Sequence, residues 1–164
     1  MTRSKAIDTS RSRSALFGAE LLITDGTATS LRELAGGGAL AVCFMRTFRC
    51  PPCRGHARRL AAASGALHEA GARCAVVVPG PPEHAEQLSG SLDAQLPVYA
   101  DPSLACFLAA GLRRLGPGIQ QSGTFAYDSQ GRELLAHRVT APMRRPDLDQ
   151  MVDRVCDCRS RALA

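Results

Sequence analysis

The chain has 164 residues, of which 45% are hydrophobic and 21% charged, the proportions of a globular protein with one ordinary domain rather than of a disordered or fibrous one. Its formal net charge of +5 comes largely from residues 1–14, so the body gives no reason to expect a nucleic-acid partner. There is no apolar run of about eighteen residues and no apolar signal core at the N-terminus, which predicts a cytoplasmic protein without a membrane partner.

Residues 1–14 are rich in Ser and Arg and hold little that could be buried. Because such a segment cannot offset its ordering entropy, we expect a disordered basic tail, with residues 15–164 as a single domain. Residues 19–34 are predicted to form a short β element whose second arm is Ser30–Leu34. No Lys-Ser or Lys-Thr follows the glycines 36–38, so a flexible connector is favoured over a phosphate-binding loop.

The next segments alternate between strand and helix. Ala39–Met45 is a continuous apolar run of strand length, as in strands that are covered on both faces. Residues 51–69 carry apolar side chains at spacings of three and four, which predicts a helix that ends at Gly71. Arg73–Val78 is a second buried strand, and Glu83–Leu88 is predicted to be a short helix.

The C-terminal half is predicted to add three strands and two helices. The strands are Leu96–Tyr99, Thr124–Tyr127 and Glu133–Val139, and the helices are Ser103–Leu112, with Asp101 or Ser103 as N-cap, and Pro146–Cys158. Parallel β-α-β units followed by an antiparallel hairpin and a last helix predict an α/β protein with a central mixed β-sheet flanked by helices.

Cys50 and Cys53 lie where the first buried strand gives way to the first long helix. A cysteine at a helix N-terminus faces unpaired backbone N–H groups and the positive end of the helix dipole, which commonly lower a cysteine pKa from about 8.5 to roughly 3.5–7.5. Cys50 is therefore the predicted nucleophile, and Cys53, one turn later, is the predicted resolving thiol. The flanking cations that could stabilise a thiolate are Arg46, Arg49 and Arg54.

Two structural alternatives remain for this pair, half of a zinc site and an inert pair of core cysteines. Zinc needs two further ligands, and Cys156 and Cys158 would project to different faces of a helix, so no metal is expected. A further alternative for Cys158 is an additional redox role, such as an intermolecular one. The other cysteines occupy apolar segments and are predicted to be core residues: Cys43, Cys74 and Cys106.

Residues 47–54, with the sequence Thr-Phe-Arg-Cys-Pro-Pro-Cys-Arg, resemble the active-site stretch of the peroxiredoxin-like branch of the alkyl hydroperoxide reductase/thiol-specific antioxidant superfamily. That branch includes prostamide/prostaglandin F synthase. The resemblance continues at residues 96–102, 123–128 and 136–138, and spans residues 20–156 altogether. It implies a thioredoxin-like fold and an antioxidant, thiol-dependent oxidoreductase that reduces a peroxide, an endoperoxide or a disulfide.

The resemblance also implies roles for particular residues. Thr47 stands three residues before Cys50, where peroxiredoxins place a threonine whose hydroxyl helps to hold the peroxide. Cys43 stands where peroxiredoxins have a proline, and Ser122-Gly123 stands where thioredoxins have a cis-proline. The predicted catalytic residues are Cys50, Cys53, Thr47 and Arg54. No resident cofactor is expected, because an external thiol or NADPH-linked reductant of the thioredoxin, glutathione or mycothiol type would reset the redox-active centre.

Three functions are compatible with these residues. The preferred one is reduction of a small-molecule peroxide, endoperoxide or similar electrophile by a Cys50 thiolate, followed by a Cys50–Cys53 disulfide. One alternative is a thiol-disulfide reductase or isomerase that acts on protein or small-molecule disulfides. The other is a non-catalytic thioredoxin-fold binding module or redox switch. A homodimer is compatible with each of them.

Overall fold

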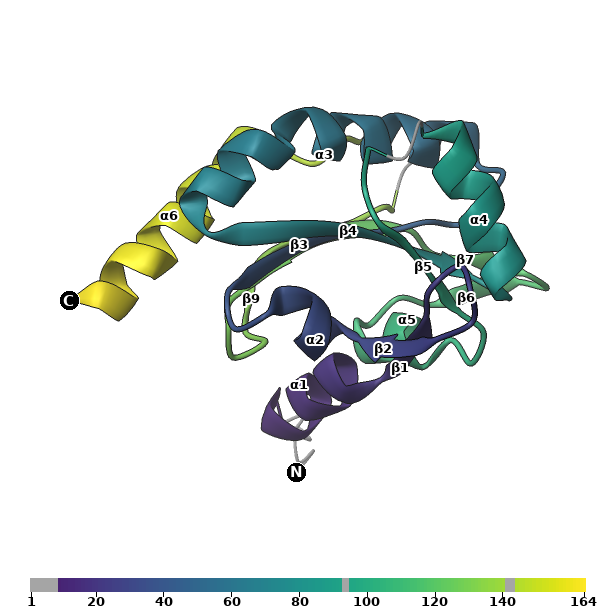
Figure 1. The fold of residues 1–164 in the computed structure, drawn as a ribbon, viewed down its shortest axis with the longest axis horizontal. Helices are drawn as coiled ribbons and strands as arrows, with labels where there is room; N and C mark the ends of the chain where they lie inside the picture. Colours follow the sequence, from purple (N-terminus) through teal and green to yellow (C-terminus); the bar gives the residue numbers. More distant parts are fainter. Residues whose placement is uncertain (1–8, 93–94, 141–143) are drawn as a thin grey trace, which may run out of the picture.

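A computed structural model describes residues 9–92, 95–140 and 144–164. Seven strands form one sheet in the order β2-β1-β5-β4-β3-β8-β9 (Figure 1). They are β1 (Glu20–Leu22), β2 (Ala28–Ser30), β3 (Ala39–Phe44), β4 (Ala72–Pro79), β5 (Val98–Asp101), β8 (Gly123–Tyr127) and β9 (Glu133–Arg138). Strands β3, β4 and β5 are parallel, whereas β8 is antiparallel to both β3 and β9. The predicted central mixed sheet is confirmed.

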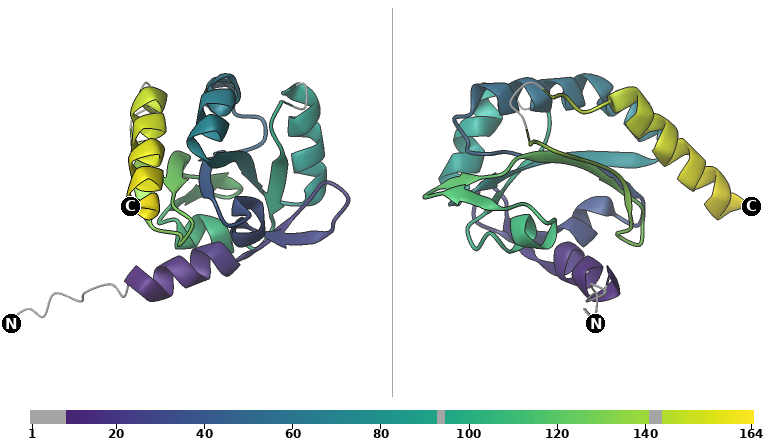
Figure 2. Two further views of the ribbon diagram at one scale, coloured as in Figure 1. Left: turned by 60° about the vertical axis from the view of Figure 1, so that its left-hand side comes forward. Right: turned by 180° about the vertical axis from the view of Figure 1, so that it is seen from behind.

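Helices cover both faces of this sheet. On one face lie α3 (Pro51–Ala70), α4 (Pro82–Ser91) and α6 (Leu148–Leu163), side by side as Figure 2 shows. On the other face lie α1 (Thr9–Gly18), α2 (Leu31–Ala35) and α5 (Ala105–Ala109). A second, two-stranded sheet joins β6 (Arg114–Gly116) to β7 (Ile119–Gln120). No helix in the described part of the chain is long and apolar enough to cross a membrane.

Strand β3 and its extension to Met45 lie at the centre of the core. Alternate residues enter different clusters, because successive side chains of a strand point to opposite faces. Cys43 and Met45 belong to the cluster under α3, and Val42 and Phe44 belong to the cluster that faces α5. The continuous apolar run predicted a strand covered on both faces, and the structure has one.

Helix α3 begins immediately after the loop that leaves β3. Pro51 and Pro52 occupy its first turn, where the missing N–H groups cost no hydrogen bond within the helix. Gly71 ends it with φ 99 and ψ 19, in the left-handed region, as the sequence predicted. The parallel β3-α3-β4 unit therefore places the start of α3 at the carboxyl end of β3.

The prediction of a disordered tail is wrong for residues 9–14, because these residues belong to helix α1. Residues 1–8 lie outside the described residues. Helix α1 is held at its C-terminal end, where Leu16 is 4% exposed and Phe17 is 5% exposed. The Phe17 ring packs edge-on against Tyr127, with centroids 5.6 Å apart. Tyr127 belongs to the distant strand β8, and α1 also packs against α5 and α2. These contacts offset the ordering entropy that the polar sequence alone could not.

The prediction of a β-strand over Ser30–Leu34 is also wrong, since most of this segment is helix α2. The Ser30 Oγ accepts a hydrogen bond from the Glu33 N–H at 3.4 Å and caps the helix. Leu31 and Ala35 turn to the core. Gly36, in the left-handed region with φ 57, ends the helix, so the glycine run begins as a helix C-cap.

The predicted helix over Ser103–Leu112 is shorter, because α5 has regular geometry only over Ala105–Ala109. The Asp101 carboxylate is fully buried and accepts the N–H of Cys106 at 2.9 Å and of Phe107 at 3.2 Å. Burial raises the pKa of this carboxyl, although these hydrogen bonds oppose the rise. Asp101 thus supplies acceptors for the start of α5 from the end of β5.

Candidate active site

Cys50 and Cys53 form one unit at the start of α3. Cys50 is the N-cap of the helix, and the Cα atoms of the two cysteines lie 5.3 Å apart, with the sulfur atoms at disulfide distance. The Cys53 N–H donates to the Cys50 Sγ at 3.4 Å. Cys53 is 4% exposed and Cys50 is half-buried. The first sulfur is therefore the more accessible one, as a nucleophile must be, and the second lies within covalent reach beneath it.

The backbone donors at this helix start are few. Pro51 and Pro52 have no N–H, and the Arg54 N–H donates to the Cys50 carbonyl oxygen at 3.1 Å. The Cys53 N–H is thus the donor aimed at the sulfur. The first turn of α3 holds no acidic residue, so the positive end of the helix dipole is not opposed there. This environment favours a thiolate at Cys50.

The loop of residues 46–49 brings the remaining predicted site residues next to the pair. The Cys50 N–H donates to the Thr47 carbonyl oxygen at 3.3 Å. The Arg54 Nη2 donates to the Phe48 carbonyl oxygen at 3.3 Å. The structure therefore places Thr47 and Arg54 beside Cys50 and Cys53, while their catalytic roles stay predictions.

The flanking arginines differ in their surroundings. Arg49 is exposed, with its guanidinium 5.1 Å from the centre of the Phe48 ring. The Nε atoms of Arg46 and Arg54 are buried and have no hydrogen-bond partner among the described residues. Arg46 in the loop and Arg54 in the first turn of α3 are thus partly buried next to the cysteine pair, whereas Arg49 faces solvent.

A cleft of about 620 Å³ opens beside this loop, a volume within the usual range of small-molecule sites. Its walls come from the loop before Cys50, the start of α4, the turn after β5 and the β6-β7 hairpin. Gln120 lines it and is 1% exposed, and neither polar atom of its side chain has a partner in the described part of the chain. This cleft was not predictable from the sequence, because no pattern indicates the β6-β7 hairpin.

One wall of the cleft is an aromatic stack. The rings of Phe48 and His84 are stacked with centroids 3.9 Å apart. The His84 Nδ1 lies 3.2 Å from the Pro79 carbonyl oxygen. Gly80 makes this approach possible, since a Cβ at this position would lie 2.5 Å from the His84 Nδ1. The stack was not predictable from the sequence, because Phe48 and His84 come from segments far apart in the chain.

His56 lies one turn beyond Cys53 on α3. Its pKa is lowered, first by partial burial and then by the neighbouring charges of His137, Arg59 and Arg145. The His56 and His137 rings have centroids 6.5 Å apart. His56 therefore favours its neutral form, which can accept or pass a proton.

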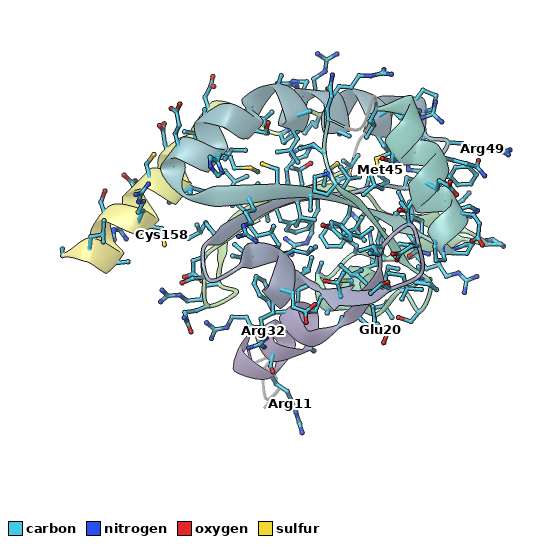
Figure 3. The ribbon with its side chains drawn as sticks, in the orientation of Figure 1. Arg11, Glu20, Arg32, Met45, Arg49 and Cys158 are labelled. Atoms are coloured by element: carbon cyan, nitrogen blue, oxygen red, sulfur yellow. A yellow bond between two sulfur atoms is a disulfide. The ribbon has the colours of Figure 1, made fainter. Side chains whose placement is uncertain are left out.

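The other cysteines stand apart from the pair. Burial raises the thiol pKa to about 11 at both Cys43 and Cys74, and raises it also at Cys106. Figure 3 shows Cys158 on α6, at the opposite end of the long axis from Arg49, which precedes Cys50. Within residues 9–92, 95–140 and 144–164, no group of three or more His, Cys, Asp or Glu is arranged to hold a metal ion.

Three solved structures share this fold over most of their length. Peroxidoxin BcpB from Mycobacterium tuberculosis is 17% identical, with 86% of this chain and 91% of that chain covered and a TM-score of 0.70. Peroxiredoxin Q from Xanthomonas campestris is 20% identical, covers 92% and 95%, and has a TM-score of 0.67. Reduced Prx3 from Vibrio vulnificus, in complex with hydrogen peroxide, is 15% identical, covers 86% and 96%, and has a TM-score of 0.72. The fold is therefore the thioredoxin fold of peroxiredoxins.

A comparison with curated proteins found no match. Membership of a family is decided by a match along the sequence itself. The sequence profile of the AhpC/TSA family matches residues 15–132, a stretch that contains the cysteine pair and all the walls of the cleft. Because this match covers well over half of its length, the chain belongs to the AhpC/TSA family and is a peroxiredoxin-like oxidoreductase.

Proposed function

We propose that this protein reduces a peroxide or a similar electrophile through Cys50, and that Cys53 completes the cycle. The observation that carries the proposal is the sulfur pair at disulfide distance at the start of α3, in a chain of the AhpC/TSA family. Family membership disfavours the alternative of a non-catalytic binding module.

In the first step, the Cys50 thiolate attacks the terminal oxygen of the hydroperoxide. An S–O bond forms, the O–O bond breaks, and the alkoxide takes a proton from solvent and leaves as the alcohol, with Cys50 as sulfenic acid. The Cys53 N–H and the dipole of α3 stabilise the attacking thiolate. In this scheme the Thr47 hydroxyl holds the peroxide, and the Arg54 cation stabilises the charge on the departing oxygen.

In the second step, the Cys53 thiol attacks the Cys50 sulfur. The S–S bond forms, the S–O bond breaks, and the oxygen leaves as water. An external thiol reductant then reduces the disulfide and is itself oxidised, so the protein needs no resident cofactor. Thioredoxin-type proteins and small thiols of the glutathione or mycothiol type are the proposed donors. The cytoplasmic location and the homodimer stay predictions.

The test compares Cys50→Ser and Cys53→Ser with a matched control, Cys156→Ser, whose side chain is exposed on α6. Cys50→Ser should abolish turnover of peroxide, endoperoxide and disulfide substrates. Cys53→Ser should stop after one turnover, and intact-mass measurement should show one added oxygen on Cys50 instead of a disulfide. Cys156→Ser should behave as the unmodified protein. Retained turnover in Cys50→Ser would end the proposal.

A second function is thiol-disulfide exchange with protein or small-molecule disulfides. The half-buried Cys50 above the buried Cys53 supports it, because such a pair can attack an exposed disulfide and then release it. Insulin reduction and hydrogen peroxide consumption, measured side by side with the same dithiol donor, separate the two functions. Fast insulin reduction with negligible peroxide consumption would favour this second function.

A further inference from the structure

We infer that His56 takes the proton from the Cys53 thiol when Cys53 attacks the oxidised Cys50, and that it returns this proton to the departing oxygen. The inference rests on the proposed function, since it assigns a residue to the second step of the same reaction. Three observations support it: the burial of Cys53, the position of His56 on the same helix and the groups that surround the imidazole ring.

Cys53 needs a proton acceptor at close range. The thiolate is the nucleophilic form of a cysteine, so the Cys53 thiol has to lose its proton as it attacks the sulfenic acid. Its side chain is 4% exposed and belongs to the apolar cluster under α3. Solvent water therefore has little access to the thiol, and a nearby side chain has to accept the proton instead.

The geometry of α3 places His56 next to Cys53. Side chains three residues apart on a helix are neighbours, with Cβ atoms about 5–6 Å apart. Helical side chains also lean toward the helix N-terminus, so the His56 ring extends back toward the turn that holds Cys53. The next turn reads Arg-Gly-His-Ala at residues 54–57. Within that turn, His56 has the side chain that can accept a proton near neutral pH.

His137 faces His56 from strand β9. Leu135 packs against the apolar cluster under α3, and His137, two residues later, lies on the same face of the sheet. The two imidazole rings are edge-on, with centroids 6.5 Å apart. The His137 Nε2 lies 3.1 Å from the Arg144 carbonyl oxygen. Since that oxygen only accepts, this nitrogen donates, and the hydrogen bond holds the second ring in place beside His56.

The surroundings of His56 keep its ring neutral. Partial burial lowers its pKa first, and the charges that face it lower the pKa further. These charges are His137 from β9, Arg59 from α3 itself and Arg145 from the segment before α6. All three oppose a positive charge on the ring. A base in this setting is available near neutral pH, and it releases a captured proton readily.

The proton balance of the step closes within the site. A nitrogen of His56 takes the proton of Cys53, and the Cys53 sulfur forms the S–S bond with Cys50. The S–O bond of the sulfenic acid breaks, and the departing hydroxide takes the proton from the imidazolium and leaves as water. His56 is then neutral again. The peroxide that oxidised Cys50 is the only oxidant needed.

The first experiment follows the second step by itself. The reduced protein is mixed with excess hydrogen peroxide, and intact mass after rapid quenching follows the conversion of Cys50 sulfenic acid into the Cys50–Cys53 disulfide. At about pH 7, His56→Gln should slow this conversion by roughly 100-fold, the lower end of general acid–base catalysis. Formation of the sulfenic acid should keep its rate. The matched control is His68→Gln, at an exposed position on α3, and it should change neither step.

The outcomes of this experiment separate the inference from the proposed function. Equal conversion rates in His56→Gln and in the unmodified protein would overturn the inference and leave the proposed function standing. No oxidation of Cys50 in the unmodified protein would overturn the proposed function itself.

The second experiment measures the same conversion between about pH 5.5 and about pH 8.5. In the unmodified protein the rate should be level above about pH 6.5 and fall only at lower pH, since the pKa of His56 is lowered from its usual value. In His56→Gln the rate should instead rise about tenfold per pH unit up to the usual thiol pKa of about 8.5, because only the thiolate fraction reacts. A purely structural defect would lower the rate by the same factor at every pH.

Two further readings of the pH profile complete the test. His137→Gln removes one of the charges that lower the pKa of His56, so the fall in rate should begin at a higher pH than in the unmodified protein. The profile of the unmodified protein needs no variant and keeps the inference testable if His56→Gln does not fold. A rise of about tenfold per pH unit between pH 6.5 and pH 8.5 in the unmodified protein would refute the role of His56.

Discussion

Gly80→Ala should destabilise the protein and weaken its peroxide reduction. Gly80 has φ +101, a backbone conformation that L side chains rarely adopt, and an alanine there costs about 1–2 kcal/mol. The new Cβ would also lie 2.5 Å from the His84 Nδ1 and 2.9 Å from its Cε1. The imidazole ring therefore has to move away from its position.

The displaced ring loses two contacts. One is the approach of its Nδ1 to the Pro79 carbonyl oxygen at 3.2 Å, and the other is the stack on Phe48 at 3.9 Å between centroids. Each is worth about 1 kcal/mol, so with the backbone cost the free energy of unfolding should fall by roughly 3–4 kcal/mol. Because Phe48 lies two residues before Cys50 and lines the cleft, kcat/KM in the proposed peroxide reduction should fall as well.

The assay is urea unfolding of the reduced protein, with Gly65→Ala as the matched control. Gly65 is exposed in the interior of α3, and a Cβ there meets nothing within 4 Å. The control should therefore gain about 1 kcal/mol from helix propensity. A Gly80→Ala midpoint equal to or above that of the unmodified protein would refute the argument from the His84 contacts.

Further predictions concern thiols, protonation and the N-terminal helix. In the reduced native protein a neutral alkylating reagent at about pH 8 should label Cys50 before Cys43 and Cys74, whose pKa burial raises to about 11, as peptide mapping can check. Burial and nearby cations lower the pKa of His56, so its contribution to stability is present above the unfolded value of about 6.5 and lost as the pH falls. The loss of unfolding free energy between about pH 7.5 and pH 5.5 should accordingly be smaller in His56→Gln. Phe17→Ala should cost about 3 kcal/mol or more in urea unfolding, and an unchanged midpoint would mean that α1 contributes no packing.

The central β3-α3-β4 unit was predictable because its signals are local. Ala39–Met45 is too apolar for any environment but a strand covered on both faces. The helix from Pro51 shows its buried face in spacings of three and four, and Gly71 ends it in the left-handed conformation. Each of these patterns depends on neighbouring residues, so the sequence carried both ends of α3.

Helices α1 and α2 were not predictable from the same kind of signal. In α1 the apolar residues gather in the last turns, and the partner that orders Phe17 is Tyr127, more than a hundred positions away in the chain. Helix α2 spans only Leu31–Ala35, too short for a helical period to be distinguished from a strand. Tertiary contacts with distant residues determine that α1 and α2 are helices, and such contacts cannot be read from a single sequence.

In the candidate site, too, local features were predictable from the sequence and features that depend on distant residues were not. The spacing of Cys50 and Cys53 at a strand-to-helix junction identified the sulfur pair, because both residues belong to one local motif. The cleft needs Phe48, His84, Leu104 and Gln120 together, and these residues come from four separate segments that only the folded sheet assembles. Local chemistry was therefore visible in the sequence, whereas the space around it was not.

Three successive carbonyl oxygens of the loop before Cys50 accept hydrogen bonds. The Gln120 N–H donates to the carbonyl of Arg46, the Cys50 N–H to that of Thr47, and the Arg54 Nη2 to that of Phe48. These donors come from β7, from the N-cap of α3 and from its first turn, so the path of the backbone to Cys50 does not depend on the exposed side chain at position 49. The charge at position 49, which lines the cleft, can therefore change without moving the sulfur.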